Sequence, residues 1–161
     1  MSELAYLDWC TAAQKIRDKQ LSPVEYCEAQ LGRIEALDSQ LNTVLHLCSD
    51  RALAQAKAAE QAVMDGAPLG PLHGVPYGLK DIIDVAGLPT TAHSKVLADN
   101  VAAADAHVTR SLDAAGGILL GKLSTHEFAL GGPSFDLPWP PARNPWDRTC
   151  MPGGSSSGSG A

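Results

Sequence analysis

Residues 106–121 read AHVTRSLDAAGGILLG, a stretch in which a helical segment runs into a short apolar one. We expect a helix over about 106–115, and the apolar run at 116–121 is short enough to be a buried parallel strand. Short apolar runs broken by Gly and Pro precede it at 74–91, where we expect strands and tight turns. Strand, helix and strand in this order predict an α/β fold.

Residues 1–66 form an N-terminal region that reads as largely helical. A first helix is expected over Leu7–Lys19. The tetrad Ser22-Pro23-Val24-Glu25 is a capping box, in which Ser22 bonds a free backbone N–H, Pro23 suits the first helical position and Glu25 reaches back. A second helix therefore begins there, with an apolar stripe at Val24, Cys27, Leu31 and Ile34.

Two further elements are expected before residue 67. A short apolar stretch at 43–47 has the character of a strand, and an Ala-rich helix follows from about Asp50 to Met64. This helix ends at Gly66, which is placed as a C′ glycine. Beyond it, residues 131–161 are rich in Pro, Gly and Ser, and 138–147 (PWPPARNPWD) reads as an extended loop.

The composition excludes several classes of function. A net charge of −6 argues against a nucleic-acid or anionic-membrane partner, because binding to such a partner needs clustered Lys and Arg. The four cysteines form no C-x-x-C pair and have no histidines at zinc-ligand spacing, so we expect reduced, largely buried thiols and no metal. The N-terminus lacks a basic segment, and no run of 18 apolar residues occurs. We expect a cytoplasmic protein without a membrane partner.

The run 152–161 (PGGSSSGSGA) leaves backbone N–H groups and hydroxyls open to a ligand. By composition alone a flexible linker is an even alternative. The letters also satisfy the nucleophile elbow G-x-S-x-G with Ser156 at its centre. That interpretation fails, because no apolar strand precedes the run and no later acid and histidine follow it.

Two other patterns are discounted. Gly116-x-x-x-x-Gly121-Lys122 lacks the Ser or Thr of a phosphate-binding loop, and we expect instead a strand that ends in a surface lysine. His126-Glu127 begins a zinc-protease pattern whose second histidine is missing.

Lys80 lies between apolar groups on a segment expected to be partly buried. An amine accepts a proton only in its neutral form, which desolvation favours, so burial would make Lys80 a base. The alternative is an ordinary ion pair with Asp81 or Asp84, and for an isolated lysine that alternative is favoured. A second motif is needed to decide.

The second motif is the serine run, and together the two resemble the amidase-signature family. The matching segments are 71-PLHGVPYGLKDIIDVAGLPTT-91, 116-GGILLGKLSTHEFALGG-132, 143-RNPWD-147 and 152-PGGSSSGSGA-161. Their order agrees with that in the family, and so does the number of residues that separate Lys80 from Ser155 along the sequence. The resemblance implies the N-terminal portion of an α/β/α sandwich with a mixed sheet, preceded by helices. Residues 1–161 would then be a single, incomplete domain, with 1–66 helical and 67–161 opening the catalytic core.

The resemblance also implies a site. In the family a lysine, a serine in a cis peptide and a nucleophilic serine form the catalytic triad. Lys80 matches the lysine and Ser155 the cis serine, with Ser156, Gly153 and Gly154 in support. Neutral Lys80 would take a proton from Ser155, whose hydroxyl would activate the nucleophile and later return a proton to the leaving amine.

In relatives the nucleophile lies roughly two dozen residues beyond the cis serine. The chain ends before that point, so we expect it to be truncated and inactive alone. We also expect its unpaired strand edges to make the chain poorly soluble or oligomeric. The implied activity is hydrolysis of a small-molecule amide without a cofactor. Two alternatives stay open: the glutamine-hydrolysing component of a tRNA-dependent amidotransferase, which works with a partner subunit, and a non-catalytic scaffold or binding module.

Overall fold

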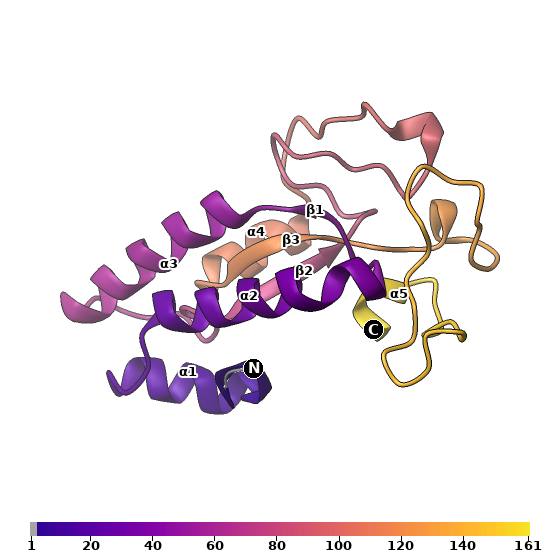
Figure 1. Ribbon diagram of the computed structural model, residues 1–161. Helices are drawn as coiled ribbons and strands as arrows, with labels where there is room; N and C mark the ends of the chain where they lie inside the picture. Colours follow the sequence, from indigo (N-terminus) through magenta and orange to yellow (C-terminus); the bar gives the residue numbers. More distant parts are fainter. Residues whose placement is uncertain (1–2) are drawn as a thin grey trace. The chain divides into compact units, whose positions relative to one another are not determined.

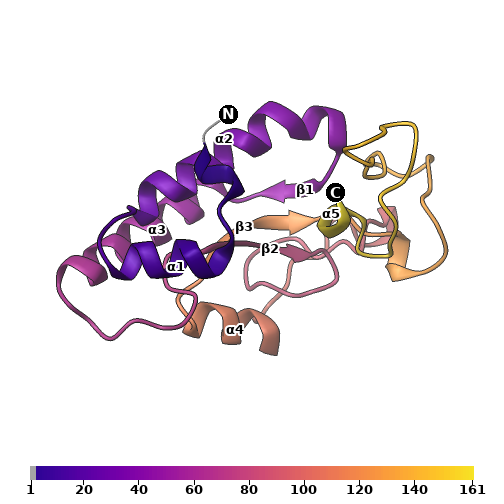
Figure 2. The ribbon, with the colours of Figure 1, turned by 90° about the horizontal axis from the view of Figure 1, so that it is seen from below.

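A computed structural model describes residues 3–161 of the chain (Figure 1). Three strands form one sheet in the order β1-β3-β2: β1 is Val44–Leu47, β2 is Pro76–Lys80 and β3 is Ile118–Leu123. Figure 2 shows β3 between its two neighbours. The expected strand at 43–47 is present, and the strand expected over the apolar run 116–121 is present with bounds shifted to Ile118–Leu123.

The sheet is mixed. β1 pairs antiparallel with β3, with Leu47 opposite Gly121 and an irregularity between Val44 and His46. β2 runs in the same direction as β3, because the N–H of Ile118 bonds the carbonyl of Val75 and the N–H of Asp81 bonds the carbonyl of Leu123. This mixed sheet with its helices confirms the predicted α/β class.

The helices begin and end close to where the sequence predicts them. They are α1 (Trp9–Arg17), α2 (Pro23–Leu41), α3 (Ser49–Met64), α4 (His107–Ala114) and α5 (Ser157–Gly160), with short 3₁₀ turns at Glu3–Tyr6, Lys95–Leu97 and Glu127–Ala129. Gly66 follows α3 with a φ of 70°, as expected of a C′ glycine. Helix α5 was not expected, since Ser and Gly are weak helix formers.

The start of α2 differs from a complete capping box. The hydroxyl of Ser22 accepts bonds from the N–H groups of Val24 and Glu25, as predicted. The same hydroxyl donates to the carboxylate of Glu60 on α3 at 2.5 Å. Ser22 thus caps α2 and ties it to a helix far along the chain.

The chain divides into two compact units. The first holds the described residues up to Ala36 together with Cys48–Tyr77 and Arg110–Leu120, and the second holds Leu37–Leu47, Gly78–Thr109 and Gly121–Ala161. The single-domain organisation, with its division at residue 66, stays a prediction.

The first unit contains the helical core. One cluster joins α1, α2 and α3 through Ala12, Ile16, Leu21, Tyr26 and Val63. A second joins α2, α3 and β3 through Cys27, Ala52, Ala56 and Ile118, with Val24 and Leu31 packed against it. The predicted apolar stripe of α2 therefore faces this core at Val24, Cys27 and Leu31.

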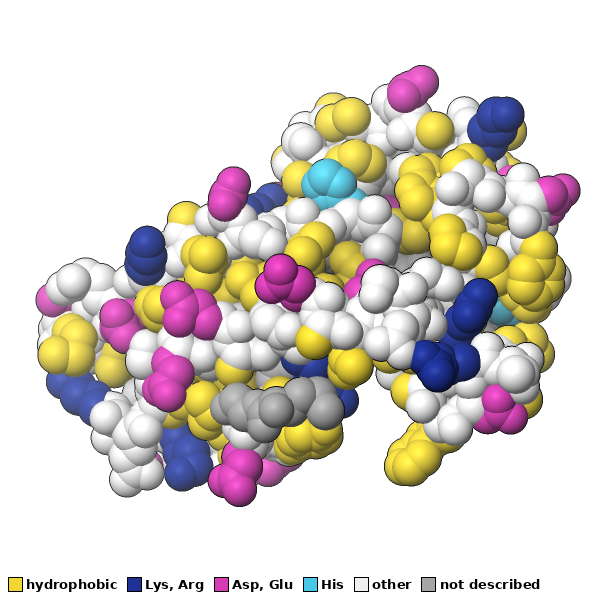
Figure 3. All heavy atoms as spheres, viewed as in Figure 1, with side chains coloured by type: hydrophobic (Ala, Val, Ile, Leu, Met, Phe, Trp, Pro, Cys, Tyr) yellow, Lys and Arg dark blue, Asp and Glu magenta, His cyan; other side chains and the backbone are white. Residues whose placement is uncertain are grey.

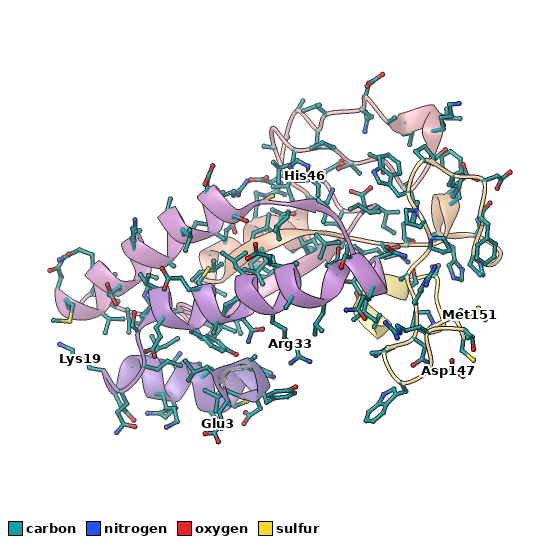
Figure 4. All side chains as sticks on the ribbon, viewed as in Figure 1. Glu3, Lys19, Arg33, His46, Asp147 and Met151 are labelled. Carbon is teal, nitrogen blue, oxygen red and sulfur yellow. The ribbon has the colours of Figure 1, made fainter. Side chains whose placement is uncertain are left out.

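The thiols are all free, but only half of them are buried. Cys27 and Cys48 are buried, whereas Cys10 and Cys150 are exposed. The expectation of largely buried thiols is wrong for Cys10, in the first turn of α1, and for Cys150, on the loop before the serine run. Asp147 and Met151 of that loop project from the ribbon in Figure 4.

The surface carries scattered charges. The face drawn in Figure 3 shows acidic and basic side chains interspersed among hydrophobic and uncharged ones. Between residues 3 and 161, no helix is both long enough and apolar enough to span a membrane.

Candidate active site

Lys80 is the last residue of β2 and lies in the second unit. Its side chain is half-buried, while that of its neighbour Leu79 is buried, as expected for successive strand residues that point to opposite sides. The Nζ atom of Lys80 donates a hydrogen bond of 2.7 Å to the Oγ atom of Ser155. The structure thus brings together two side chains that are 75 residues apart in the sequence.

Ser155 is held on its other side by its backbone. The Gly154–Ser155 peptide bond is cis, and the Ser155 carbonyl accepts a hydrogen bond of 2.9 Å from the N–H of His126. The residue is only half-buried. Its hydroxyl therefore has a fixed amine partner and stands near the surface of the unit.

The two glycines before Ser155 have separate reasons to be glycine. Gly153 has a φ of 91°, in a region that side chains disfavour. Gly154 lies directly against the imidazole of His126, where a Cβ atom would overlap the ring. His126 is 6% exposed, and its Nδ1 lies 3.0 Å from the Gly131 carbonyl.

The remaining serines of the run form the short helix α5. Ser156 is exposed, and its carbonyl accepts a bond from the N–H of Gly160. Ser157 is buried, and its hydroxyl lies 3.5 Å from that of Ser124. The N–H of Gly158 bonds the Ser124 carbonyl at 2.9 Å. The run is a packed segment, so the flexible-linker alternative is wrong.

Asp81 does not pair with Lys80. Its Oδ1 atom lies 2.9 Å from the Nζ atom of Lys122, and both side chains are almost completely buried. Lys122 also donates to the Pro89 carbonyl at 2.8 Å and to the Thr90 hydroxyl at 3.0 Å. The expectation of a surface lysine at 122 is wrong, because three acceptors in the second unit compensate its burial.

The other Asp81 oxygen is also satisfied. Oδ2 accepts bonds from the N–H and the hydroxyl of Thr91, at 2.9 and 2.5 Å. The backbone of Asp81 bonds Leu123 and Ala92. This aspartate is thus fixed by both its side chain and its main chain.

Two side chains that pack against the serine run have no signature in the sequence. Ser124 and His126 contact the run, but an isolated Ser or His carries no local signal of burial. The family pattern included their positions without giving them a role. In residues 3–161, no three His, Cys, Asp or Glu side chains gather as a metal site would require.

Comparison with known proteins identifies the family. The family model described as Amidase matches residues 25–161 of the chain. The chain belongs to the amidase family. The predicted membership of the amidase-signature group is confirmed, and so is the prediction that this chain corresponds to the N-terminal portion of the fold.

Curated relatives of this amidase chain are much longer than it is. The A-type component of the glutamyl-tRNA(Gln) amidotransferase from Streptomyces coelicolor is 44% identical over 161 residues, which are 100% of this chain and 32% of that protein. The corresponding protein of Nocardia farcinica is 43% identical over 162 residues, which are 100% of this chain and 33% of that protein. The chain spans about a third of the length of the curated relatives that it matches.

Solved structures show the same relation. A structure described as a vestigial protein complex that reveals the origins of an s-triazine catabolic enzyme has a TM-score of 0.92 and 36% identity, over 96% of this chain and 34% of the other. A bacterial aryl acylamidase of the amidase-signature family has a TM-score of 0.90 and 30% identity, over 98% and 33%. The amidase chain therefore has the fold of the first third of these enzymes.

Proposed function

We propose that this chain is the N-terminal part of an amide hydrolase and supplies the proton relay of its active site. The observation that carries the proposal is the 2.7 Å contact between Lys80 Nζ and Ser155 Oγ in a chain of the amidase family. A general base must lie within about 2.6–3.2 Å of its proton donor, and this pair meets that condition. The acyl donor is a small-molecule amide.

The relay uses two side chains of this chain and one group outside it. Neutral Lys80 accepts the hydroxyl proton of Ser155, and Ser155 in turn accepts the proton of the nucleophilic serine as that serine attacks the amide carbonyl. The same path run backwards delivers a proton to the leaving amine, and water then hydrolyses the acyl-enzyme. No net proton is gained or lost by the protein.

The supporting residues act through the backbone in this proposal. Gly153 and Gly154 carry the chain past the His126 ring into Ser155, and Ser156 begins the turn that follows. We place the nucleophile and its oxyanion donors beyond residue 161, so the 161 residues alone should not hydrolyse amides at a useful rate. The proposed setting is the cytoplasm.

A second candidate rests on the curated relatives. The 44% identity to a component of a glutamyl-tRNA(Gln) amidotransferase favours glutamine as the amide, with the released ammonia passing to a partner subunit. The relay would be the same. The two candidates differ in substrate and in dependence on a partner.

The test compares the 161-residue chain with the product of the complete reading frame that contains it. In the longer product, Lys80→Ala and Ser155→Ala should each lower kcat for a simple amide by about 10²–10⁴-fold, the usual range for loss of a general acid–base group. The 161-residue chain should show no turnover with or without these changes. The matched controls are Lys95→Ala and Ser159→Ala, which change exposed residues of the same types and should leave kcat unchanged.

The outcomes separate the candidates. Release of ammonia from glutamine that requires added partner subunits favours the amidotransferase, and partner-independent hydrolysis of other amides favours the simple hydrolase. A longer product that keeps full activity after Lys80→Ala would refute the relay. A reading frame without any further serine segment would favour the non-catalytic scaffold.

A further inference from the structure

The buried ion pair Asp81–Lys122 is not used by the proposed relay. Its two side chains are 1% and 0% exposed, and Asp81 directly follows Lys80 at the end of β2. A buried charge pair is costly to desolvate, so it calls for a reason beyond stability.

The backbone at the end of β2 supplies that reason. Asp81 lies in the turn that directly follows β2, and its backbone N–H still bonds the Leu123 carbonyl of β3. Because Asp81 is joined directly to Lys80, a side chain fixed at Asp81 also restricts the backbone from which the Lys80 side chain projects. Asp81 is held toward Lys122 by an ion pair of 2.9 Å and toward Thr91 by two hydrogen bonds. We propose that the Asp81–Lys122 pair is a positioning device that aims Lys80 at Ser155. The effect of this positioning on catalysis rests on the proposed function, whereas the positioning itself does not.

The pair also separates the roles of two nearby lysines. The Lys122 ammonium has a carboxylate, a carbonyl and a hydroxyl as partners, which together engage its three protons. With Asp81 committed to Lys122, Lys80 keeps the Ser155 hydroxyl as its partner in place of a carboxylate. A carboxylate beside Lys80 would favour its charged form, in which it cannot accept a proton.

The pair further anchors the segment that follows it. Lys122 bonds Pro89 and Thr90, and the Asp81 carboxylate bonds Thr91, so the two charged groups fix residues 89–91. The main-chain carbonyl of Asp81 also accepts a bond from the N–H of Ala92. Loss of either charge should therefore break the contacts between the end of β2 and the segment after Leu88. Lys80 would then no longer be held against Ser155.

The experiment uses the 161-residue chain labelled with ¹³C at the lysine Cε positions. The Lys80 and Lys95 signals are assigned with Lys80→Arg and Lys95→Arg and followed by NMR. Asp81→Asn and Lys122→Met should each move the Lys80 signal toward the position of exposed Lys95. The double variant should move it no further than either single variant, because the two charges act as one unit.

Two further variants keep the test decisive. Arg51→Gln removes the partly exposed Arg51–Asp113 pair of the first unit and should leave the Lys80 signal in place. Thr91→Val keeps the shape of the side chain but removes its bond to Asp81, and it should shift the Lys80 signal part of the way even if Asp81→Asn does not fold.

An unchanged Lys80 signal in folded Asp81→Asn, or in folded Thr91→Val, would overturn the positioning role. So would full additivity of the two charge variants. Neither result bears on whether Lys80 is a catalytic base, which is decided by the activity of Lys80→Ala. Failure of the positioning role and failure of the relay are thus distinguishable.

Discussion

Single residues in the serine run are constrained by contacts that its composition hides. A Cβ atom at Gly154 would overlap the His126 ring, and Gly158 lies against the backbone of Thr43 and Ser124. No residue with a side chain fits at these two positions, because other groups already occupy the space beside the backbone. The sequence shows only that the run is small and polar, which is why a linker was an equal alternative.

The contact between Gly154 and His126 predicts a specific stability defect. Gly154→Ala should lower the free energy of unfolding by about 1–3 kcal/mol, because overpacking forces the ring or the backbone to shift. Urea unfolding followed by circular dichroism measures the change. His126→Ala removes the ring, so the double variant should lose less stability than the sum of the two single variants. Equal stability of Gly154→Ala and the unchanged chain would contradict the close contact.

At the scale of elements, helix α2 offers a position where glycine has no structural task. Gly32 lies in the interior of α2, and a Cβ atom there would meet no neighbour within 4 Å. Alanine restricts the unfolded chain and favours the helix, so Gly32→Ala should raise the free energy of unfolding by about 0.5–1 kcal/mol. Thermal and urea unfolding check the sign. A loss of stability would mean that the exposed face of α2 has a contact in solution.

The elements show which parts of a fold local sequence can predict. Helices α1 to α4 and strands β1 and β3 follow from apolar spacing, a capping serine and a C′ glycine, all of which act within a few residues. The burial of Lys122 follows from Asp81 and Thr90, and the second of these is 32 residues away. Local patterns carry no information about such partners. The pairing of Lys80 with Ser155 is likewise indicated by the family pattern, whereas local spacing gives neither residue a partner.

Across the whole molecule, the four cysteines differ in solvent exposure. Cys10 and Cys150 are exposed, whereas Cys48 and Cys27 are 7% and 0% exposed. Desolvation, with a smaller effect from Glu28, raises the pKa of the Cys27 thiol to about 11. The reactive thiolate of Cys27 is therefore disfavoured in the folded state both by its environment and by access.

A thiol reagent at pH 8 should accordingly modify the folded chain in two stages. Cys10 and Cys150 should react first, and Cys27 and Cys48 only as the chain opens, with all four reacting quickly in denaturant. Peptide mass spectrometry gives the rate at each site. Because the folded state holds the Cys27 proton more tightly than the unfolded state, its contribution to stability is intact below about pH 9 and is lost as the pH rises toward about 11. The delay in the modification of Cys27 relative to Cys10 should shorten over that pH interval. If Cys27 instead reacts as fast as Cys10 at pH 8, the helical core around Cys27 is accessible to the reagent in solution.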